Sequence, residues 1–165
     1  MIRRIVSGGQ TGADRAALDW AIQHDVPHGG WCPKGRKAED GPLDTRYQLT
    51  ETETANYSER TRLNVADSDG TLIVNLGDLD GGTLKTLAFT EELGKPIFVV
   101  QIDLESEGLD LNLATQINEW IRLHSISKLN LAGPRESKRP GTFAAAWKIL
   151  DALALIDAIK PVSKG

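Results

Sequence analysis

The sequence predicts a single-domain α/β protein over residues 1–165, with a Rossmann-like, open and mostly parallel sheet and helices on both faces. Two observations favour this fold class. Short apolar runs typical of buried parallel strands alternate along the chain with helical patterns. In addition, loops rich in glycine or in cations follow several of these strands, where open α/β sheets bind their ligands.

The first element is predicted as a strand over residues 2–6 that leads through a glycine turn into a helix. The strand is carried by Ile2, Ile5 and Val6, and Gly8 and Gly9 end it. Apolar residues then recur at helical spacing: Ala13, Ala17, Trp20 and Ala21. Glycines let backbone amides approach a ligand, and the helix start attracts anions, so we expect a phosphate-like ligand here. The alternative is a plain turn without a ligand.

A short strand is predicted around residues 28–31, followed by a cluster of cations and a long loop. Lys34, Arg36 and Lys37 fall within four residues, and residues 38–54 are polar without a clear period. Loops of this length in a compact domain are usually functional or mobile. The cations follow a predicted strand end, which favours ligand binding. A solvated surface patch is the alternative.

The middle of the chain repeats the order of strand, glycine loop and helix. A helix over residues 57–66 and a turn over 67–70 precede the buried strand 71–74. A second glycine-rich loop, 75–83, leads into a helix over 84–93 that a glycine and a proline end. The carboxylates of Asp67 and Asp69, with Ser68, could hold a ribose, a pterin amide or a metal. Equally, Asp67 could cap a turn.

The last third adds two strands and two helices. Strand 96–102 is followed by a polar connection, 103–110, and a helix over 112–124. Strand 128–132 ends in a third loop, 133–141, that contains three cations. The last helix, 142–159, is apolar over most of its circumference, which predicts burial on two sides and a subunit contact.

Composition excludes several classes of protein. The net charge of −4 provides no broad basic face for nucleic acid. No run approaches the ~20 apolar residues of a membrane span, and arginines interrupt the N-terminal apolar run, which is unlike a signal peptide. A single cysteine, Cys32, allows no internal disulfide and fits a reducing cytoplasm. The three histidines show no metal-ligand spacing with Cys32.

The loops that follow the predicted strands are expected to converge on one crevice. They offer backbone amides, hydroxyls and cations, which suits a small, anionic and phosphorylated molecule. The cations are Arg15, Lys34, Arg36, Lys37, Arg135, Lys138 and Arg139. The predicted ligand-binding residues are Gly8, Gly9, Gln10, Thr11, Gly12, Arg15, Lys34, Arg36, Asp67, Ser68, Asp69, Gly81, Gly82, Thr83, Arg135 and Ser137.

Four motifs resemble the putative molybdenum carrier family over nearly the whole chain. They are the stretches at residues 8–15, 30–36, 67–71 and 132–137. The resemblance implies a Rossmann-like fold, a homo-oligomer (dimer or tetramer), and binding and protection of the molybdenum cofactor (molybdopterin). Molybdate- or tungstate-type oxyanions are related ligands. Molybdoenzymes or cofactor-synthesis proteins would then be partners.

The family is in turn similar to the lysine-decarboxylase-like phosphoribohydrolases. Those enzymes carry a glycine-rich loop with a catalytic glutamate, and Thr86 stands at the matching position here. The resemblance therefore implies a non-catalytic carrier and no catalytic residue. The alternatives are a nucleotide-binding sensor and a phosphoribohydrolase-like enzyme that acts on a nucleotide monophosphate.

Overall fold

A five-stranded, fully parallel sheet forms the centre of the molecule in the computed structural model, which describes residues 1–105, 108 and 110–161. The sheet strands are β1 (Arg4–Val6), β2 (His28–Gly29), β5 (Gly70–Asn75), β6 (Ile97–Gln101) and β7 (Lys128–Ala132). The described helices are α1 (Ala13–Gln23), α2 (Tyr57–Ala66), α3 (Gly81–Glu92), α4 (Leu111–Leu123) and α5 (Thr142–Leu155). The predicted Rossmann-like α/β class is confirmed.

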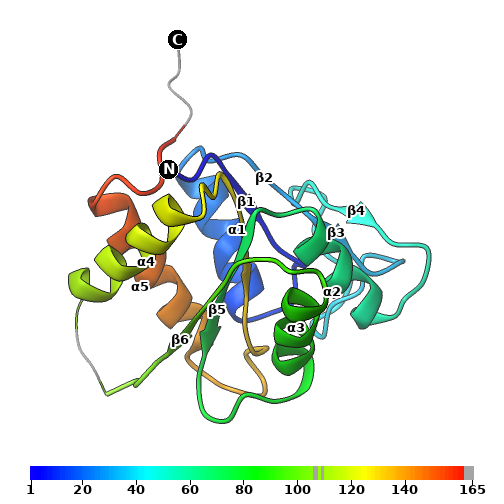
Figure 1. Cartoon of the computed structure of the whole chain (residues 1–165). Helices are drawn as coiled ribbons and strands as arrows, with labels where there is room; N and C mark the ends of the chain where they lie inside the picture. The colour runs from blue at the N-terminus through cyan, green and yellow to red at the C-terminus, as the bar shows by residue number, and fades with distance from the viewer. Residues whose placement is uncertain (106–107, 109, 162–165) are drawn as a thin grey trace.

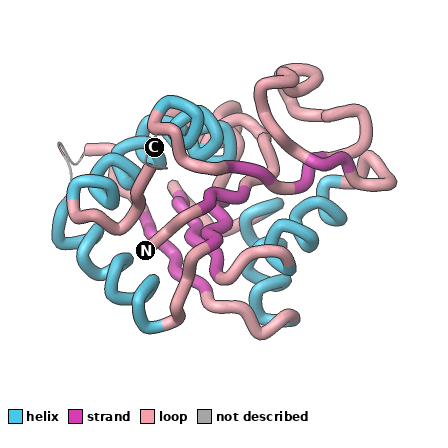
Figure 2. The backbone as a smooth tube through the Cα atoms, turned by 90° about the horizontal axis from the view of Figure 1, so that it is seen from above, coloured by secondary structure: helices cyan, strands magenta, loops and turns pink. Residues whose placement is uncertain are grey.

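Helices cover both faces of the sheet (Figures 1 and 2). Helix α5 packs against α1 and α4 on one face, and α2 packs against α3 on the other. This arrangement is typical of parallel sheets, because each crossover between parallel strands places a helix over one face.

The strand order, β2-β1-β7-β5-β6, is a circularly permuted version of the order in a doubly wound sheet. Counted from β7 as the first strand, the same order reads 3-2-1-4-5, the order of the Rossmann sheet. The start and end of the described chain lie side by side (Figure 1), and the Ile2 amide donates to the Ala158 carbonyl at 2.7 Å. The topological switch point therefore lies between β7 and β5.

The predicted strand at residues 28–31 is in fact two strands in different sheets. Strand β2 belongs to the main sheet, whereas β3 (Trp31–Cys32) pairs with β4 (Thr50–Glu51), a strand within the predicted long loop. Gly30 separates β2 from β3 with a φ of 131°, and a side chain there would overlap the Ser7 carbonyl. The two-residue strands carry too little periodicity to be found from sequence.

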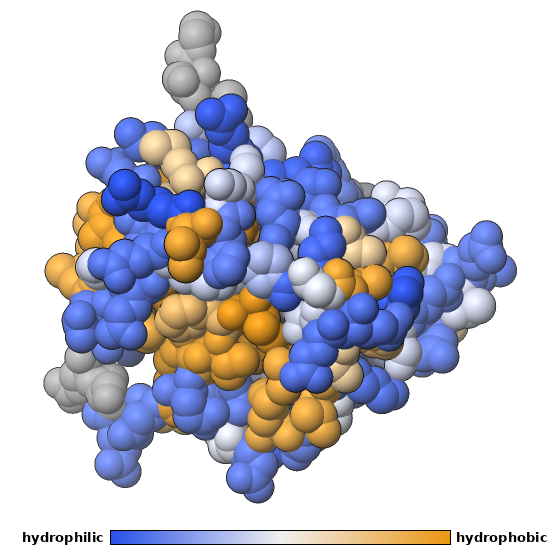
Figure 3. All heavy atoms as spheres, viewed as in Figure 1, coloured by the Kyte–Doolittle hydropathy of each residue, from blue (hydrophilic) through white to orange (hydrophobic). Residues whose placement is uncertain are grey.

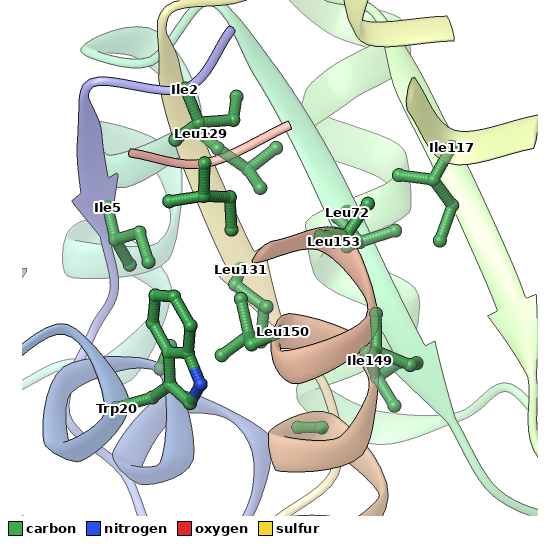
Figure 4. Close-up of a cluster of buried hydrophobic side chains, with 14 of the residues drawn as sticks. Ile2, Ile5, Trp20, Leu72, Ile117, Leu129, Leu131, Ile149, Leu150 and Leu153 are labelled. Atoms are coloured by element: carbon green, nitrogen blue, oxygen red, sulfur yellow. The ribbon is translucent and has the colours of Figure 1, made fainter. Parts of the chain in front are cut away.

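Helix α5 ends at Leu155, earlier than predicted, and its apolar circumference is used inside the protein. Its buried side chains join a core that includes residues of α1, β5, β7 and α4 (Figure 4). Trp20 of α1 is buried in this core, and its indole N–H donates to the Asp151 carboxylate of α5 at 2.7 Å. Burial of α5 on two sides thus follows from intramolecular packing.

Strand β6 is an edge of the sheet, and it leaves apolar side chains at the surface. Val99 is 41% exposed and Leu84 of the neighbouring α3 is 48% exposed. Figure 3 shows apolar side chains gathered on the face around β6 and α3. Within the described residues, no helix is both long enough and apolar enough to span a membrane.

Candidate functional site

A cleft of about 420 Å³ lies at the carboxyl ends of β1 and β7 and beside the switch point. It is lined by the turn after β1, the end of β7 with its following loop, and polar side chains of α2 and α3. Crevices at this position bind the ligands of doubly wound proteins, and the volume is in the range of small-molecule sites. Helix α2 lies over the same end of the sheet and contributes Tyr57, Ser58, Arg60, Thr61 and Asn64.

Close packing of glycines brings the strand-end loops together. A side chain at Gly133 would overlap the Val74 carbonyl at the end of β5, and it would lie 2.7 Å from Ala13 Cβ. A side chain at Gly12, whose φ is 82°, would overlap the Pro134 carbonyl. The loops after β1, β5 and β7 can therefore approach one another only because glycine occupies these positions.

One end of the cleft is formed by the start of α3. Asp80 precedes the helix, but its side chain makes no capping hydrogen bond. Its carboxylate instead contacts Lys138 Nζ at 2.7 Å and Arg139 Nη2 at 3.3 Å. The first amides of a helix have no partner within the helix, so this end offers backbone donors to an anion, and Lys138, which Asp80 pairs, lines the cleft beside them. Gly82 leaves open space beside these amides.

The wall of the cleft also holds a buried arginine and a buried aspartate. Arg60 of α2 donates from Nη1 to the Gly8 carbonyl at 2.5 Å, and the same nitrogen lies 3.6 Å from the Asp14 carboxylate. Both residues are less than 9% exposed. A buried pair of this kind keeps its charge only while both partners stay in place.

The pKa of Asp14 is raised from 3.8 to about 6. Burial raises it most, because removal from water disfavours the charged carboxylate. The Arg60 guanidinium and the backbone amides of Gln10 and Gly8 oppose this effect without cancelling it. A carboxyl group of this kind can bind and release a proton close to neutral pH.

Cations also gather around Tyr57 at the cleft. Lys37 Nζ lies 4.6 Å from the centre of the Tyr57 ring, and the guanidinium carbons of Arg60 and Arg135 lie 5.3 and 5.6 Å from it. Three cations near one aromatic ring produce a positive local field although the whole chain is acidic. The cleft is therefore suited to an anionic molecule.

Six of the predicted ligand-binding residues line this cleft: Gly8, Gln10, Gly81, Gly82, Thr83 and Arg135. Thr86, at the position of the glutamate of the phosphoribohydrolases, also lines it and donates its hydroxyl to the Gly82 carbonyl at 3.0 Å. The structure thus brings together parts of the loops after β1, β5 and β7, whereas no residue of the cation cluster at 33–37, which was also expected to converge here, lines the cleft.

Thr11 and Ser137 lie outside the cleft and meet around a carboxylate of the long loop. Glu39 accepts hydrogen bonds from the hydroxyls of both residues and lies 3.8 Å from Arg135. Although burial raises the pKa of Glu39, the bonds from Ser137 and Thr11 and the Arg135 charge hold it below its usual value. The chain itself supplies an anion to these donors.

Arg15 and Arg36 are likewise engaged by the protein. Arg15 donates to the Gly9 carbonyl and makes two bonds of 2.9 Å to Asp40. Arg36 donates to the carbonyls of Leu43, Asp44, Leu49 and Tyr47, and so holds the long loop together. Gly9, Gly12 and the exposed Lys34 also lie outside the cleft.

The predicted group Asp67, Ser68 and Asp69 lies at the opposite end of the parallel strands from the cleft. These residues come immediately before β5, so they stand at the amino end of a parallel strand. Asp67 accepts from the Trp31 indole at 2.5 Å, and Asp69 accepts from the amides of Ser127 and Lys128. Among the residues that the structure describes, no cluster of His, Cys, Asp and Glu could hold a metal.

Sequence reasoning missed the contribution of α2. Tyr57, Arg60 and Asn64 line the cleft from one face of this helix, together with Thr61. Their spacing of three and four residues is that of a continuous helical face. The available signal in the sequence was the polar face of α2, which carries an arginine and an aromatic residue. Only the tertiary structure shows that this face lines the cleft. Lys85 and Asn130 also line the cleft.

The fold and the cleft together define a doubly wound α/β protein with a ligand crevice at its switch point, in which the strand order is circularly permuted. The chain belongs to the circularly permutated YpsA SLOG family, which it matches over residues 5–154. It is 50% identical to a putative molybdenum carrier protein from Syntrophus aciditrophicus SB, whose crystal structure has been determined. That match covers 92% of this chain and 94% of the other, with a TM-score of 0.84. No curated protein matches the sequence.

Proposed function

We propose that this protein binds a small anionic ligand in the cleft and carries it without catalysis, the leading candidate being the molybdenum cofactor. The observation that carries the proposal is the start of α3, where no side chain caps the helix and two cations stand beside the free amides. A phosphate or oxo-anion is the chemical group that such a site favours. The name of the Syntrophus protein, a putative molybdenum carrier, supports the choice of ligand.

Thr86 stands where the phosphoribohydrolases have a catalytic glutamate, which favours a carrier over an enzyme. Thr86 lines the cleft and donates its hydroxyl to the helix backbone. A hydroxyl engaged in this way does not supply the general acid or base that hydrolysis of a nucleotide requires. The protein would then hold and protect its ligand and leave it chemically unchanged.

A second candidate function, hydrolysis of a nucleotide monophosphate, is favoured by Asp14. Its carboxyl lies in the same cleft, and its pKa of about 6 suits a general acid or base. Release of a free base from a nucleotide monophosphate by wild-type protein, lost in Asp14→Asn, would support this function. It would contradict the non-catalytic carrier.

The test of the proposed function is a thermal-shift screen with molybdate, tungstate, isolated molybdenum cofactor and a set of nucleotide monophosphates. A ligand at a hundred times its Kd stabilises the folded state by about 2.7 kcal/mol, which gives a visible shift in Tm. Stabilisation by the cofactor or its oxyanions alone is the expected result. Stabilisation by nucleotides alone would favour the sensor or the hydrolase, and no stabilisation by any of them would contradict ligand binding.

We also propose that the chain forms a homo-oligomer through the face around β6. An edge strand with unpaired backbone groups and exposed apolar side chains is a natural site for a second copy. Val99 and Leu84 lie on this face. Light scattering on wild type and Val99→Lys should show a dimer or tetramer that the charged variant dissociates, and a monomeric wild type would contradict it.

A further inference from the structure

The wall of the cleft contains a hydrogen-bond donor without a partner. Gln10 is only 5% exposed and lines the cleft, and its Nε2 has no hydrogen-bond partner. Asn75 Oδ1 is the other buried side-chain atom without a partner in the described residues, and Asn75 does not line the cleft. Buried polar groups are normally paired, because an unpaired one costs about 1–3 kcal/mol. The free donor at Gln10 therefore calls for an acceptor from outside the chain.

The orientation of the Gln10 side chain is fixed by its oxygen. Oε1 accepts from the Thr11 amide at 3.0 Å and from the Glu39 amide at 2.9 Å. A rotated side-chain amide would place an N–H group against both backbone donors and lose both bonds. The group left without a partner is therefore a donor, and its partner must be an acceptor such as a carbonyl oxygen or a ring nitrogen.

A carboxylate acceptor in the first turn of α1 lines the same cleft. Asp14 lines the cleft and receives hydrogen bonds from the backbone amides of Gln10 and Gly8. A carboxylate has about four lone-pair positions, so two amide bonds and the Arg60 guanidinium 3.6 Å away leave capacity for another donor. The turn after β1 thus presents an N–H donor and a carboxylate acceptor within five residues, and both belong to the wall of one cleft.

The cleft is also larger than a bare oxyanion requires. Its volume of about 420 Å³ is that of a site for a cofactor or a nucleotide. The anion-binding features lie at the start of α3 with Lys138, whereas Gln10 and Asp14 come from the turn after β1. A ligand that satisfies both sets carries an anionic group at one end and a polar group at the other.

We propose that Gln10 and Asp14 form a second subsite, which recognises a ring carbonyl and the adjacent ring N–H of a fused heterocycle whose phosphate lies at α3. This rests on the proposed function, because it assumes that the start of α3 binds the phosphate. Gln10 Nε2 donates to the ring carbonyl, and the Asp14 carboxylate accepts from the ring N–H. A guanine and a pterin share this edge, so the ligand is a phosphorylated guanine- or pterin-type molecule and not a free oxyanion.

The experiment is calorimetric titration of the full chain with inorganic phosphate, molybdate, ribose 5-phosphate, AMP, GMP and isolated molybdenum cofactor. GMP presents the ring carbonyl and N–H, AMP presents an amino group in place of the carbonyl, and ribose 5-phosphate lacks the ring. We expect GMP or the cofactor to bind at least tenfold more tightly than ribose 5-phosphate and AMP. Sites built to hydrogen-bond a group reject analogues without it more strongly still.

Gln10→Glu is the variant that tests the donor. The carboxylate keeps an acceptor for the Thr11 and Glu39 amides but replaces the free N–H with a second acceptor, so the preference for GMP or the cofactor should disappear. Gln23→Glu adds the same charge at an exposed position of α1 and should keep the preference. Circular dichroism checks that both variants fold, and the comparison of GMP with AMP on wild type needs no variant.

The outcomes separate the two proposals. A preference that Gln10→Glu removes supports the subsite, and the preferred ligand tells a guanine nucleotide from a pterin cofactor. If neither GMP nor the cofactor binds more tightly than AMP and ribose 5-phosphate, the subsite is overturned and the proposed function stays intact. Binding of molybdate as tight as that of the larger ligands, or a preference unchanged in Gln10→Glu, also overturns it. If no anion binds at all, the proposed function itself fails.

Discussion

The two glycine turns of this protein, after β1 and after β5, look alike in sequence but differ in what their polar groups contact. In the turn after β1, Arg15 binds Gly9 and Asp40, and Thr11 binds Glu39. In the turn after β5, the helix start is uncapped and Gly82 has open space beside it. The cation and the hydroxyl of the first turn are engaged by the chain, and among its described buried side-chain groups only the Gln10 N–H is free, whereas the second turn leaves backbone amides for a ligand. Glycines and cations after a strand therefore do not by themselves distinguish a structural turn from a binding turn.

A methyl group added to each turn tests the difference between the two turns most directly. In Gly8→Ala the new Cβ overlaps Arg60 Nη1 and displaces the buried guanidinium from Asp14, at a cost of about 2–4 kcal/mol. In Gly82→Ala no atom lies within 4 Å of the new Cβ, so stability should change by less than about 1 kcal/mol. Urea unfolding measures both. Equal losses in the two variants would contradict the distinction between the turns.

The second prediction concerns the pH dependence that Asp14 gives to the first turn. Its pKa is raised from 3.8 to about 6, so its contribution to stability is complete below pH 4 and is lost as pH rises through about 6. The difference between a pKa of 3.8 and one of about 6 corresponds to about 3 kcal/mol of unfolding free energy. Asp14→Asn should therefore flatten the unfolding free energy between pH 4 and pH 7, relative to wild type.

The matched control for Asp14→Asn is Asp78→Asn. The Asp78 side chain is exposed and does not line the cleft. The unfolding free energy of Asp78→Asn should therefore depend on pH as that of the wild type does. A profile of Asp14→Asn that also follows the wild type would show that the buried carboxyl titrates as it does in the unfolded chain.

The third prediction tests whether the anion binds at the second turn, at the start of α3. Lys138→Ala removes the cation that lies 2.7 Å from Asp80 at the start of α3, and it should weaken binding of a phosphorylated ligand about tenfold, or 1.4 kcal/mol. Lys34→Ala removes an exposed cation outside the cleft and should leave affinity unchanged. Titration calorimetry measures both. A loss that is larger in Lys34→Ala would place the anion elsewhere.

The smallest expected effect belongs to Arg15. Sequence alone predicts that Arg15→Ala weakens ligand binding, but the structure engages its guanidinium with Gly9 and Asp40. We now expect a loss of about 1 kcal/mol in stability and less than a twofold change in affinity, because the pair is partly exposed. A tenfold loss of affinity without a change in Tm would contradict this expectation and show that Arg15 binds the ligand.

The order of strands and helices was readable from the sequence, because buried parallel strands are short apolar runs and amphipathic helices repeat every 3.6 residues. Strands β5 and β6 are examples, since the centre of β5 is Leu72–Val74 and β6 is apolar except for Gln101. Strands β3 and β4 were not readable, because two residues carry no period. The residues of the site were readable in part, since Gly8, Gln10 and the start of α3 follow strands directly.

The sequence by itself determined the fold class, the strand-end loops and the family, because these depend on local periodicity and on motifs. Only the tertiary structure decided which polar groups are free. Arg36 and Glu39 carry charges that suit a ligand or its binding site, yet carbonyls and hydroxyls of the chain already engage them. The sequence places Gln10 among the binding residues, but its unpaired N–H follows from the contacts of its oxygen with the neighbouring Thr11 amide and the distant Glu39 amide. Whether a group is available to a ligand depends on its three-dimensional partners, which a linear pattern does not contain.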